Sequence, residues 1–390
     1  MKILRVIPSM DPEQGGPCQG IRNAIPAMRE LGVQNEVVCF DPPDADYLDS
    51  DPFVIHTIGN GKTPWKYNAR LIPWLTANFK NYDVVIVHAL WLYHSYATIK
   101  AIKSFRNANT NSPKVYLMPH GMLDPYFQKA TTRKWKALRN EFYWKIIENK
   151  VINSADGILF TCEEELLLAR TTFSQYRPRR EINVGYGVQS PPAYHEEMKA
   201  SLAQKLPKWN GKPYLLFLSR IHPKKGVDLL IEAYLKLEQE IEYLPQLIIA
   251  GPGLEQTYGK EMQVRASSSP NIFFPGMLSG AAKWGAFYEC EAFILPSHQE
   301  NFGIAVVEAL ACAKPVLISN KVNIWREIIR ENGGIVKNDS QKETYHLLEE
   351  WSSLPKNKKL SMSKSAQEVY TRSFTIEEAA KNFVDGIRSL

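Results

Sequence analysis

Short apolar runs with β-character alternate with segments of helical period along the whole chain of 390 residues. This alternation is typical of βαβ units, in which helices cover both faces of a parallel sheet. The sequence therefore predicts an α/β protein with doubly wound parallel sheets. The first half contains the runs ILRVI, NEVVCF, VVIVHAL, VYLMPH, GILFTC and INVGYG, and the second half YLLFLS, QLIIAG, IFFPG, AFILP, PVLIS and GGIVK.

The length predicts two domains, because a single core rarely organises so many residues. Residues 189–211 are rich in proline and charge, a composition that suits an interdomain connection. We expect one domain over residues 1–188 and a second over 189–373. Residues 374–390 have the period of a final helix.

Composition places the chain among folded, soluble proteins, with 44% hydrophobic and 23% charged residues. Its five cysteines are scattered without metal-site spacing, which predicts reduced thiols in a cytoplasmic protein. The first apolar run is too short for a secretory signal, and no uncharged stretch approaches the ~20 residues of a membrane span. We therefore expect a cytoplasmic protein.

Two glutamates, Glu300 and Glu308, flank a predicted strand-to-helix turn within Pro296–Ser319. Glu300 is expected in the loop and Glu308 inside the helix, and on one helix they would lie ~12 Å apart, too far to act on one atom. Between them Gly303 allows close backbone approach, and the free N–H groups of a helix start attract phosphate. A sugar nucleotide fits this layout. Equally, Glu308 is a buried glutamate compensated by a partner side chain, and Glu300 a solvated loop charge.

Two cations follow the predicted strand YLLFLS, in the segment Phe217–Ala233. Arg220 and Lys225, with Gly226 next, project from a strand's carboxyl end, where open α/β sheets bind ligands. A guanidinium and an ammonium there would stabilise a leaving pyrophosphate. The simpler interpretation is that they keep a surface loop soluble.

These two segments resemble the donor-site motifs of retaining glycosyltransferases of family 4. The resemblance implies the GT-B fold, with two facing Rossmann-like domains and a cleft between them, and a final helix crossing back to the N-terminal domain. It covers Tyr214–Ser319 strongly and the first half weakly. The sequence departs from the family pattern at Tyr186, Asn301 and Ala313. The implied donor-binding residues are Gly16, Arg220, Lys225, Gly251, Met277, Leu278, Glu300, Asn301, Phe302, Gly303, Ile304 and Glu308, and the implied catalytic residues are His120, Arg220, Lys225 and Glu300.

His120 ends a predicted strand, and in the resembled family a histidine at this place contacts the donor sugar. It is followed by Asp124, which with Trp91 we assign to the acceptor site. Gly15 and Gly16 follow the first strand, where they either let a ligand approach the backbone or simply form a turn. The run WLY between His88 and His94 lines an acceptor site or belongs to the core.

We predict no metal and no cofactor other than the nucleotide-sugar donor. Asp44 and Asp46 form an Asp-x-Asp triplet, but they lie in an acidic loop without a flanking apolar strand. The cations of Arg220 and Lys225, with the helix terminus, supply the neutralising charge instead.

The net charge of +6 is concentrated in residues 129–150, which hold seven Lys or Arg against two Glu among Trp135, Phe142, Tyr143 and Trp144. Such a segment suits contact with an anionic membrane at the inner face, where a lipid-linked acceptor would lie. It is equally compatible with a solvated helix whose aromatic residues pack inward. Nucleic acid is not an expected partner.

Together these features predict a metal-independent retaining hexosyltransferase that moves glucose from UDP-glucose to a glycan or lipid-linked glycan in polysaccharide biosynthesis. The alternatives are a sugar-nucleotide epimerase of similar fold and a non-catalytic sugar-nucleotide-binding scaffold. Intact Glu300, Glu308, Arg220 and Lys225 argue against the scaffold.

Overall fold

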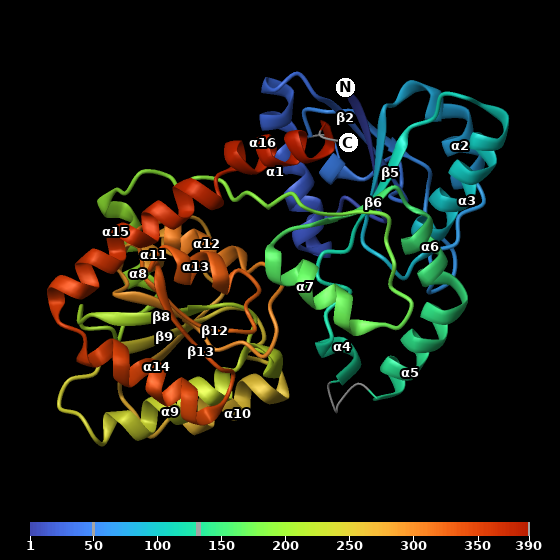
Figure 1. The fold of residues 1–390 in the computed structure, drawn as a ribbon. Coiled ribbons are helices and arrows are strands. Elements are labelled where there is room, and N and C mark those ends of the chain that lie inside the picture. Colours follow the sequence, from blue (N-terminus) through green and yellow to red (C-terminus); the bar gives the residue numbers. More distant parts are fainter. Residues whose placement is uncertain (49–50, 130–133, 389–390) are drawn as a thin grey trace. The chain divides into compact units, whose positions relative to one another are not determined.

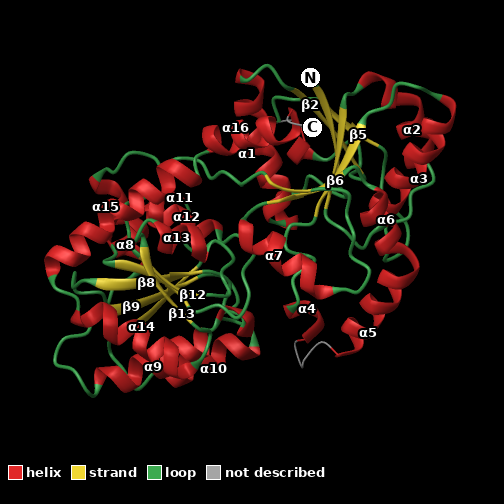
Figure 2. Ribbon diagram, viewed as in Figure 1, coloured by secondary structure: helices red, strands yellow, loops and turns green. Residues whose placement is uncertain are grey.

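The computed structural model describes residues 1–48, 51–129 and 134–388. The chain divides into an N-terminal unit, Met1–Gly187 with Ile376–Leu390, and a C-terminal unit, Val188–Thr375. Each unit contains one parallel sheet with helices on both faces (Figures 1 and 2). The predicted α/β class with two Rossmann-like sheets is confirmed, and every apolar run predicted as a strand overlaps an observed one.

The N-terminal unit has a seven-stranded sheet in the order β3-β2-β1-β4-β5-β6-β7. This is the doubly wound order, in which strands are added outward on one side of β1 and then, from β4, on the other side. Such an order leaves a crevice at the carboxyl ends of β1 and β4. The strands are β1 (Lys2–Val6), β2 (Gln34–Cys39), β3 (Ile55–Thr57), β4 (Val84–His88), β5 (Lys114–Met118), β6 (Gly157–Phe160) and β7 (Glu181–Asn183).

Strand β4 shows why both faces of this sheet are covered. Its side chains alternate between the faces, as in any strand. Val85 and Val87 join the core under α2, α3 and α6, whereas Val84 and Ile86 join the core under α1 and α16. The helices of the unit are α1 (Gly16–Glu30), α2 (Leu71–Asn78), α3 (Tyr93–Ala108), α4 (Tyr126–Lys129), α5 (Lys134–Tyr143), the π-helix η5 (Trp144–Glu148), α6 (Asn149–Ser154), α7 (Glu163–Thr172) and α16 (Ile376–Arg388), with short 3₁₀ turns η1 (Pro12–Gln14), η2 (Asp46–Leu48) and η3 (Phe79–Asn81).

The C-terminal unit has a six-stranded parallel sheet in the order β10-β9-β8-β11-β12-β13. Helices α9, α10 and α14 pack on one face, and α8, α11, α12, α13 and α15 lie on the other (Figure 1). The strands are β8 (Tyr214–Leu218), β9 (Gln246–Ala250), β10 (Ile272–Gly276), β11 (Ala292–Leu295), β12 (Val316–Ser319) and β13 (Gly334–Lys337). The helices are α8 (Glu196–Lys205), the 3₁₀ turn η6 (Pro223–Lys225), α9 (Val227–Glu238), α10 (Thr257–Ala266), α11 (Gly280–Glu289), α12 (Ile304–Ala311), α13 (Trp325–Arg330), α14 (Gln341–Ser353) and α15 (Lys356–Ser373).

Two elements differ from the sequence-based expectation. Strand β3 was not predicted, because it is a three-residue edge strand whose residues are all only partly buried. The segment 189–211, expected as a connection, contains α8, which buries Met198 and Leu202 and packs on α11. None of the described helices is long and apolar enough to cross a bilayer.

Candidate functional site in the loops after β8 and β11

In the sheet of the C-terminal unit, the order in which the chain adds strands reverses between β8 and β11. From β8 the chain continues to β9 and β10 on one side, and from β11 to β12 and β13 on the other. Open α/β sheets bind ligands at the carboxyl ends of the two strands at such a switch point. The loop 219–226 follows β8 and the loop 296–303 follows β11, so both predicted donor motifs lie at this place.

Hydrogen bonds join these two loops directly. The carbonyl of Lys224 accepts from the Ser297 hydroxyl at 3.0 Å and from the His298 amide at 2.9 Å. Gly226 adopts a left-handed φ of 68°, and a Cβ at this position would lie 2.1 Å from the carbonyl oxygen of Pro296. Close packing of the loops therefore requires glycine at this position.

The predicted pair Lys225 and Glu300 forms an ion pair between Nζ and Oε2. Lys225 is buried, which makes its ammonium a fixed charge rather than a mobile surface group. Glu300 is held through its backbone, because its N–H donates to Lys321 at 2.8 Å and its carbonyl accepts from Asn323 at 2.9 Å. Arg220, by contrast, is exposed after β8 and has no acidic partner among the described residues. It is free to meet an anionic ligand.

Helix α12 begins beside Glu300. Gly303 is its N-cap, with a left-handed φ of 78°, and Ile304 is its first residue. The first N–H groups of any helix lack intrahelical acceptors and carry the positive end of its dipole, a suitable environment for phosphate. The two residues before the cap are fixed by packing, because Asn301 accepts from Asn323 at 3.4 Å and the ring of Phe302 packs edge-on against Phe374.

Glu308 lies within α12, as predicted, and is buried. Its carboxylate accepts a hydrogen bond from Lys283 Nζ on α11 at 2.6 Å. Burial raises the pKa of Glu308, and the Lys283 ammonium opposes that rise. The structure thus supplies the compensating partner of the simpler interpretation, and a ribose diol would have to join or replace Lys283. Sequence reasoning missed Lys283, which lies on another helix and carries no motif.

The remaining donor candidates of the C-terminal unit lie at the same carboxyl edge of its sheet. Gly251 directly follows β9 with a φ of 146°, and a Cβ there would meet the carbonyl oxygen of Ser219 at 1.8 Å. Met277 and Leu278 follow β10, where Met277 is 68% exposed and Leu278 is buried. The structural need for glycine at position 251 is thus clear, and its role in donor binding stays a prediction.

In the N-terminal unit, a chain of hydrogen bonds runs from Arg5 through His88 to His120. Arg5 Nη1 contacts His88 Nε2 at 3.1 Å, and His88 Nδ1 contacts His120 Nε2 at 2.9 Å. A guanidinium only donates, so His88 Nε2 accepts and its Nδ1 carries the proton. That proton is donated to His120 Nε2, which leaves the hydrogen of neutral His120 on Nδ1.

Burial keeps both imidazoles neutral. It lowers the pKa of His120 to about 3 and the pKa of His88 well below its ordinary value, and the charge of Arg5 lowers both further. Arg5 itself is buried and also donates to Asn35 and to the sulfur of Met28. Burial lowers its pKa to about 10. With the two histidines and Tyr186, Arg5 lines a small cavity of about 40 Å³.

Glu165 positions the backbone at His120, a role that sequence reasoning missed. His120 has a left-handed φ of 52°, and the next amide, Gly121 N–H, donates to Glu165 at 2.5 Å. The second carboxylate oxygen accepts from the amide and hydroxyl of Thr161 at 2.8 and 2.6 Å. Its sequence context, three consecutive glutamates at the start of α7, gives no signal for this contact.

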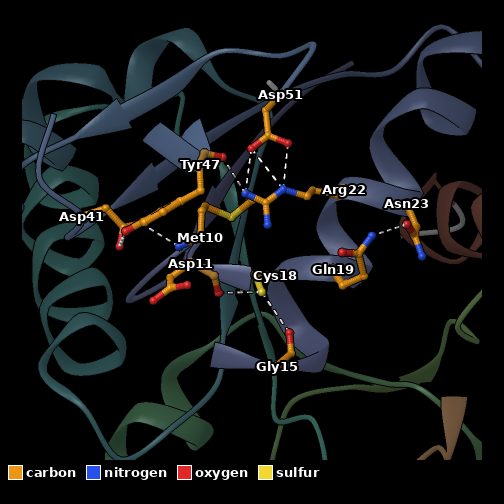
Figure 3. A network of polar contacts seen from close by, with 10 residues as sticks. All are labelled: Met10, Asp11, Gly15, Cys18, Gln19, Arg22, Asn23, Asp41, Tyr47 and Asp51. Carbon is orange, nitrogen blue, oxygen red and sulfur yellow. Dashed lines mark hydrogen bonds and ion pairs between the residues drawn. The ribbon is translucent and has the colours of Figure 1, made fainter. Parts of the chain in front are cut away.

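The glycine-containing loop after β1 is held by Asp41 (Figure 3). This carboxylate accepts from the Met10 amide at 2.6 Å and from the Tyr47 hydroxyl at 2.9 Å. Cys18 donates to the carbonyl of Gly15 at 2.9 Å, and Gly16 begins α1. This network gives the loop a structural explanation, while contact of Gly16 with a donor stays a prediction.

The acceptor candidates have structural partners of their own. Asp124 accepts from the Tyr126 amide at 2.8 Å at the start of α4. Trp91 packs against the rings of Trp144 and Phe173, with centroids 6.4 and 5.5 Å away. Their acceptor roles stay predictions. Within residues 1–48, 51–129 and 134–388 no three His, Cys, Asp or Glu side chains gather as metal ligands would.

Residues 198–369 match the family described as glycosyl transferases group 1. Similar curated proteins include an uncharacterized glycosyltransferase of Methanocaldococcus jannaschii, 26% identical over 139 residues, which are 36% of this chain and 35% of that protein. Another is the O-antigen chain mannosyltransferase B of Escherichia coli, 27% identical over 143 residues, covering 36% and 37%. The chain therefore spans about a third of the length of these relatives.

Solved structures resemble the whole chain. The crystal structure of Anabaena HepE in complex with UDP covers 100% of both chains with a TM-score of 0.74 and 17% identity. Sucrose-phosphate synthase of Thermosynechococcus elongatus covers 100% of this chain and 99% of its own, with a TM-score of 0.71 and 17% identity. At these identities the likeness establishes the fold, which is GT-B. The chain thus has the GT-B fold, and its residues 198–369, most of its C-terminal unit, match the glycosyl transferases group 1 family.

Proposed function

We propose that the protein is a retaining glycosyltransferase that moves a hexose from a nucleotide-diphosphate sugar, with UDP-glucose as donor, to a glycan or lipid-linked glycan in polysaccharide biosynthesis. The observation that carries the proposal is the meeting of Arg220, the Lys225–Glu300 pair and the start of α12 at the β8/β11 switch point. The family of residues 198–369 and the UDP and UDP-glucose complexes of the structurally similar HepE support it.

The proposed donor lies with its pyrophosphate between Arg220, Lys225 and the N-terminus of α12. Two cations and a helix dipole neutralise the charge that develops as the glycosidic bond breaks, without a bound metal. Glu300, beside Lys225, accepts hydrogen bonds from the hydroxyls of the sugar. Glu308 accepts from the ribose diol, in place of or together with Lys283.

Retention of configuration is proposed to proceed by front-face attack. In this route the acceptor hydroxyl attacks the anomeric carbon on the side of the leaving nucleotide, whose phosphate oxygen takes up the hydroxyl proton. Glu300 is already engaged by Lys225, so it is poorly suited to be a nucleophile. The role of His120 at the donor sugar stays a prediction, and its neutral state at physiological pH suits a hydrogen-bond donor.

The test is a thermal-shift titration with UDP, GDP, ADP and their glucose or mannose esters, in the presence of a chelator. We expect a shift with UDP and UDP-glucose, and a loss of ~10–100-fold in affinity in Glu308→Ala and Glu300→Ala, since each removes hydrogen bonds to a charged group. Release of UDP on incubation with UDP-glucose then separates an enzyme from a binding scaffold, and sugar analysis of the product separates transfer from epimerisation.

A matched control is Glu291→Ala. Glu291 also forms an ion pair in the C-terminal unit, with Lys359 at 2.7 Å, but it lies at the opposite, amino end of β11. This variant is expected to bind nucleotide like the wild type. If no nucleotide shifts the melting temperature, or if Glu291→Ala weakens binding as much as Glu300→Ala, the donor assignment is wrong.

A further inference from the structure

Helix α5 and the π-helix η5 that follows it present a stripe of large apolar side chains to solvent, here called the α5 stripe. Trp135, Leu138, Phe142 and Ile146 are 85%, 63%, 68% and 47% exposed. At ~100° per residue the first three lie within about 60° of one another on the helix surface. Single exposed apolar side chains are ordinary, but an aligned row of this kind marks an interaction surface. This outcome corrects one expectation, since these aromatic side chains do not all pack inward.

The opposite side of the same segment fixes this orientation. Trp144, in the π-helix η5, is fully buried and stacks on Phe173 with ring centroids 4.5 Å apart. Its indole N–H donates to the carbonyl of Ser174 at 2.7 Å. Because Trp144 anchors the segment to the core, the stripe is turned outward by the fold.

Positive charge surrounds the stripe. Between residues 134 and 150 the exposed cations are accompanied by one carboxyl group at the surface, that of Glu141, which pairs with Lys145 at 3.5 Å. The other acid of the segment, Glu148, is fully buried, and burial raises its pKa to about 8, so it adds little negative charge at neutral pH. The exposed cations are Lys134, Lys136, Arg139, Lys145 and Lys150.

The stripe continues into a groove of about 790 Å³ on the same unit. Ile146 and Lys150 line the groove together with aromatic residues of the preceding loops and of α3. Lys100 lies over the ring of Tyr96 at 5.9 Å from its centroid, and Lys103 lines the groove beyond it. Amphipathic aromatic rings with lysines around them suit the boundary between acyl chains and head groups.

We propose that this surface, formed by the α5 stripe and the adjoining groove, docks on an anionic phospholipid bilayer. Trp135, Leu138 and Phe142 enter the interface, and Lys100, Lys103 and Lys150 bind head-group phosphates. Charge complementarity selects this occupant, because a second copy of the chain meeting stripe to stripe would bring like charges together. The side chains of this surface on the segment 129–150 all lie between residues 134 and 150, and residues 130–133 lie outside the described residues. Docking through this surface does not depend on the donor site.

The test is flotation of the full-length protein with vesicles of phosphatidylcholine alone or mixed with phosphatidylglycerol, at low and high salt. We expect binding to the mixed vesicles that falls with salt, and at least ~tenfold weaker binding in the triple variant Trp135→Ser/Leu138→Ser/Phe142→Ser. The variant Lys100→Gln/Lys103→Gln/Lys150→Gln is expected to bind more weakly and with less salt dependence.

Two comparisons keep this test decisive. Val264→Ser/Leu360→Ser removes apolar side chains that are 72% and 57% exposed in the C-terminal unit, and it should bind like the wild type. The tryptophan fluorescence of the wild type should shift to the blue on vesicle binding, and the part of this shift that comes from Trp135 should be absent in Trp135→Phe. Absence of wild-type binding, equal binding to neutral vesicles, or full binding by the serine variant would overturn the proposal. Self-association that only the stripe variant abolishes would instead identify a second copy as the occupant.

Discussion

At the residue scale, Lys283 shows what a partner does for a buried acid. Glu308 is 9% exposed and accepts from the Lys283 ammonium at 2.6 Å, while burial pushes its pKa upward. A carboxyl whose folded pKa lies above its unfolded value costs stability as pH rises between the two, because only the unfolded chain releases the proton. Lys283 limits this cost by favouring the ionised form.

Lys283→Met is therefore expected to lower the free energy of unfolding by about 1–2 kcal/mol at neutral pH, since the pair is partly exposed. The loss in the free energy of unfolding, relative to the wild type, should be larger at pH 8 than at pH 5. Urea unfolding at both values measures it. In Lys283→Met/Glu308→Gln most of the deficit should disappear; an additive result for the two changes would show that the side chains are not coupled.

Arg5 controls the histidine pair at the same scale. Its guanidinium donates to His88, which fixes both tautomers, and its charge lowers both pKa values. In Arg5→Gln we expect the pKa of His88 to rise, while burial, the larger cause of its low value, still holds it below the ordinary range. We also expect its Nε2 to lose its purely accepting state. Nitrogen chemical shifts of labelled histidine measure both effects. His94, whose Nε2 donates to the His88 carbonyl, is the internal reference and should not change; an unaltered His88 spectrum would contradict this account.

At the scale of elements, the π-helix η5 buries a carboxyl group. Glu148 ends this turn and is fully buried, and its Oε1 accepts a long hydrogen bond of 3.4 Å from the Ser95 hydroxyl. Burial raises its pKa to about 8. Between pH ~4.5 and 8 the unfolded chain is ionised here while the folded one stays protonated, so folding stability falls as pH rises through this range.

Glu148→Gln should remove this pH dependence. Relative to the wild type, the glutamine variant is expected to gain ~2–4 kcal/mol between pH 5 and pH 8, in line with the displaced pKa. Denaturant titrations across this pH range measure the difference. Glu141→Gln, on the exposed part of the same segment, is the control and should leave the slope unchanged; parallel wild-type and Glu148→Gln curves would show that Glu148 is ionised in the fold.

The strands and loops also show which parts of the fold can be predicted from the sequence. Strands β8 and β11 and the polar loops after them are predictable, because each is a local apolar run followed by Gly, Pro or charge. Their adjacency in the sheet is not local information, and neither is the contact between Lys283 and Glu308. The same holds for Arg5, an ordinary strand residue in sequence that the fold places against His88.

At the scale of the whole molecule, the N-terminal unit is built from two separated stretches of chain. Helix α16 buries Phe383, Val384 and Ile387 against a core that contains Ile3, Met28 and strand residues of the sheet. Phe383→Ala is expected to lower the stability of this unit by about 3–5 kcal/mol through the cavity it leaves. Amide hydrogen exchange should show faster exchange in the N-terminal sheet and little change in the C-terminal one.

The reciprocal variant is Phe287→Ala, which empties a fully buried site on α11 in the C-terminal unit. In this variant, amide hydrogen exchange should accelerate in strands β8 to β13 and stay unchanged in strands β1 to β7. If either variant accelerates exchange equally in both sheets, the two units unfold as one cooperative body and the division of the chain has no energetic meaning.

The position of α16 also bears on how the chain is synthesised. A ribosome produces the strands of the N-terminal unit first, yet the helix that covers one face of their sheet is made only after the complete C-terminal unit. During that interval Ile3, Val84, Ile86 and their neighbours lack part of their apolar cover. The oldest part of the nascent polypeptide is therefore finished last, and it is where a chaperone would be needed during translation.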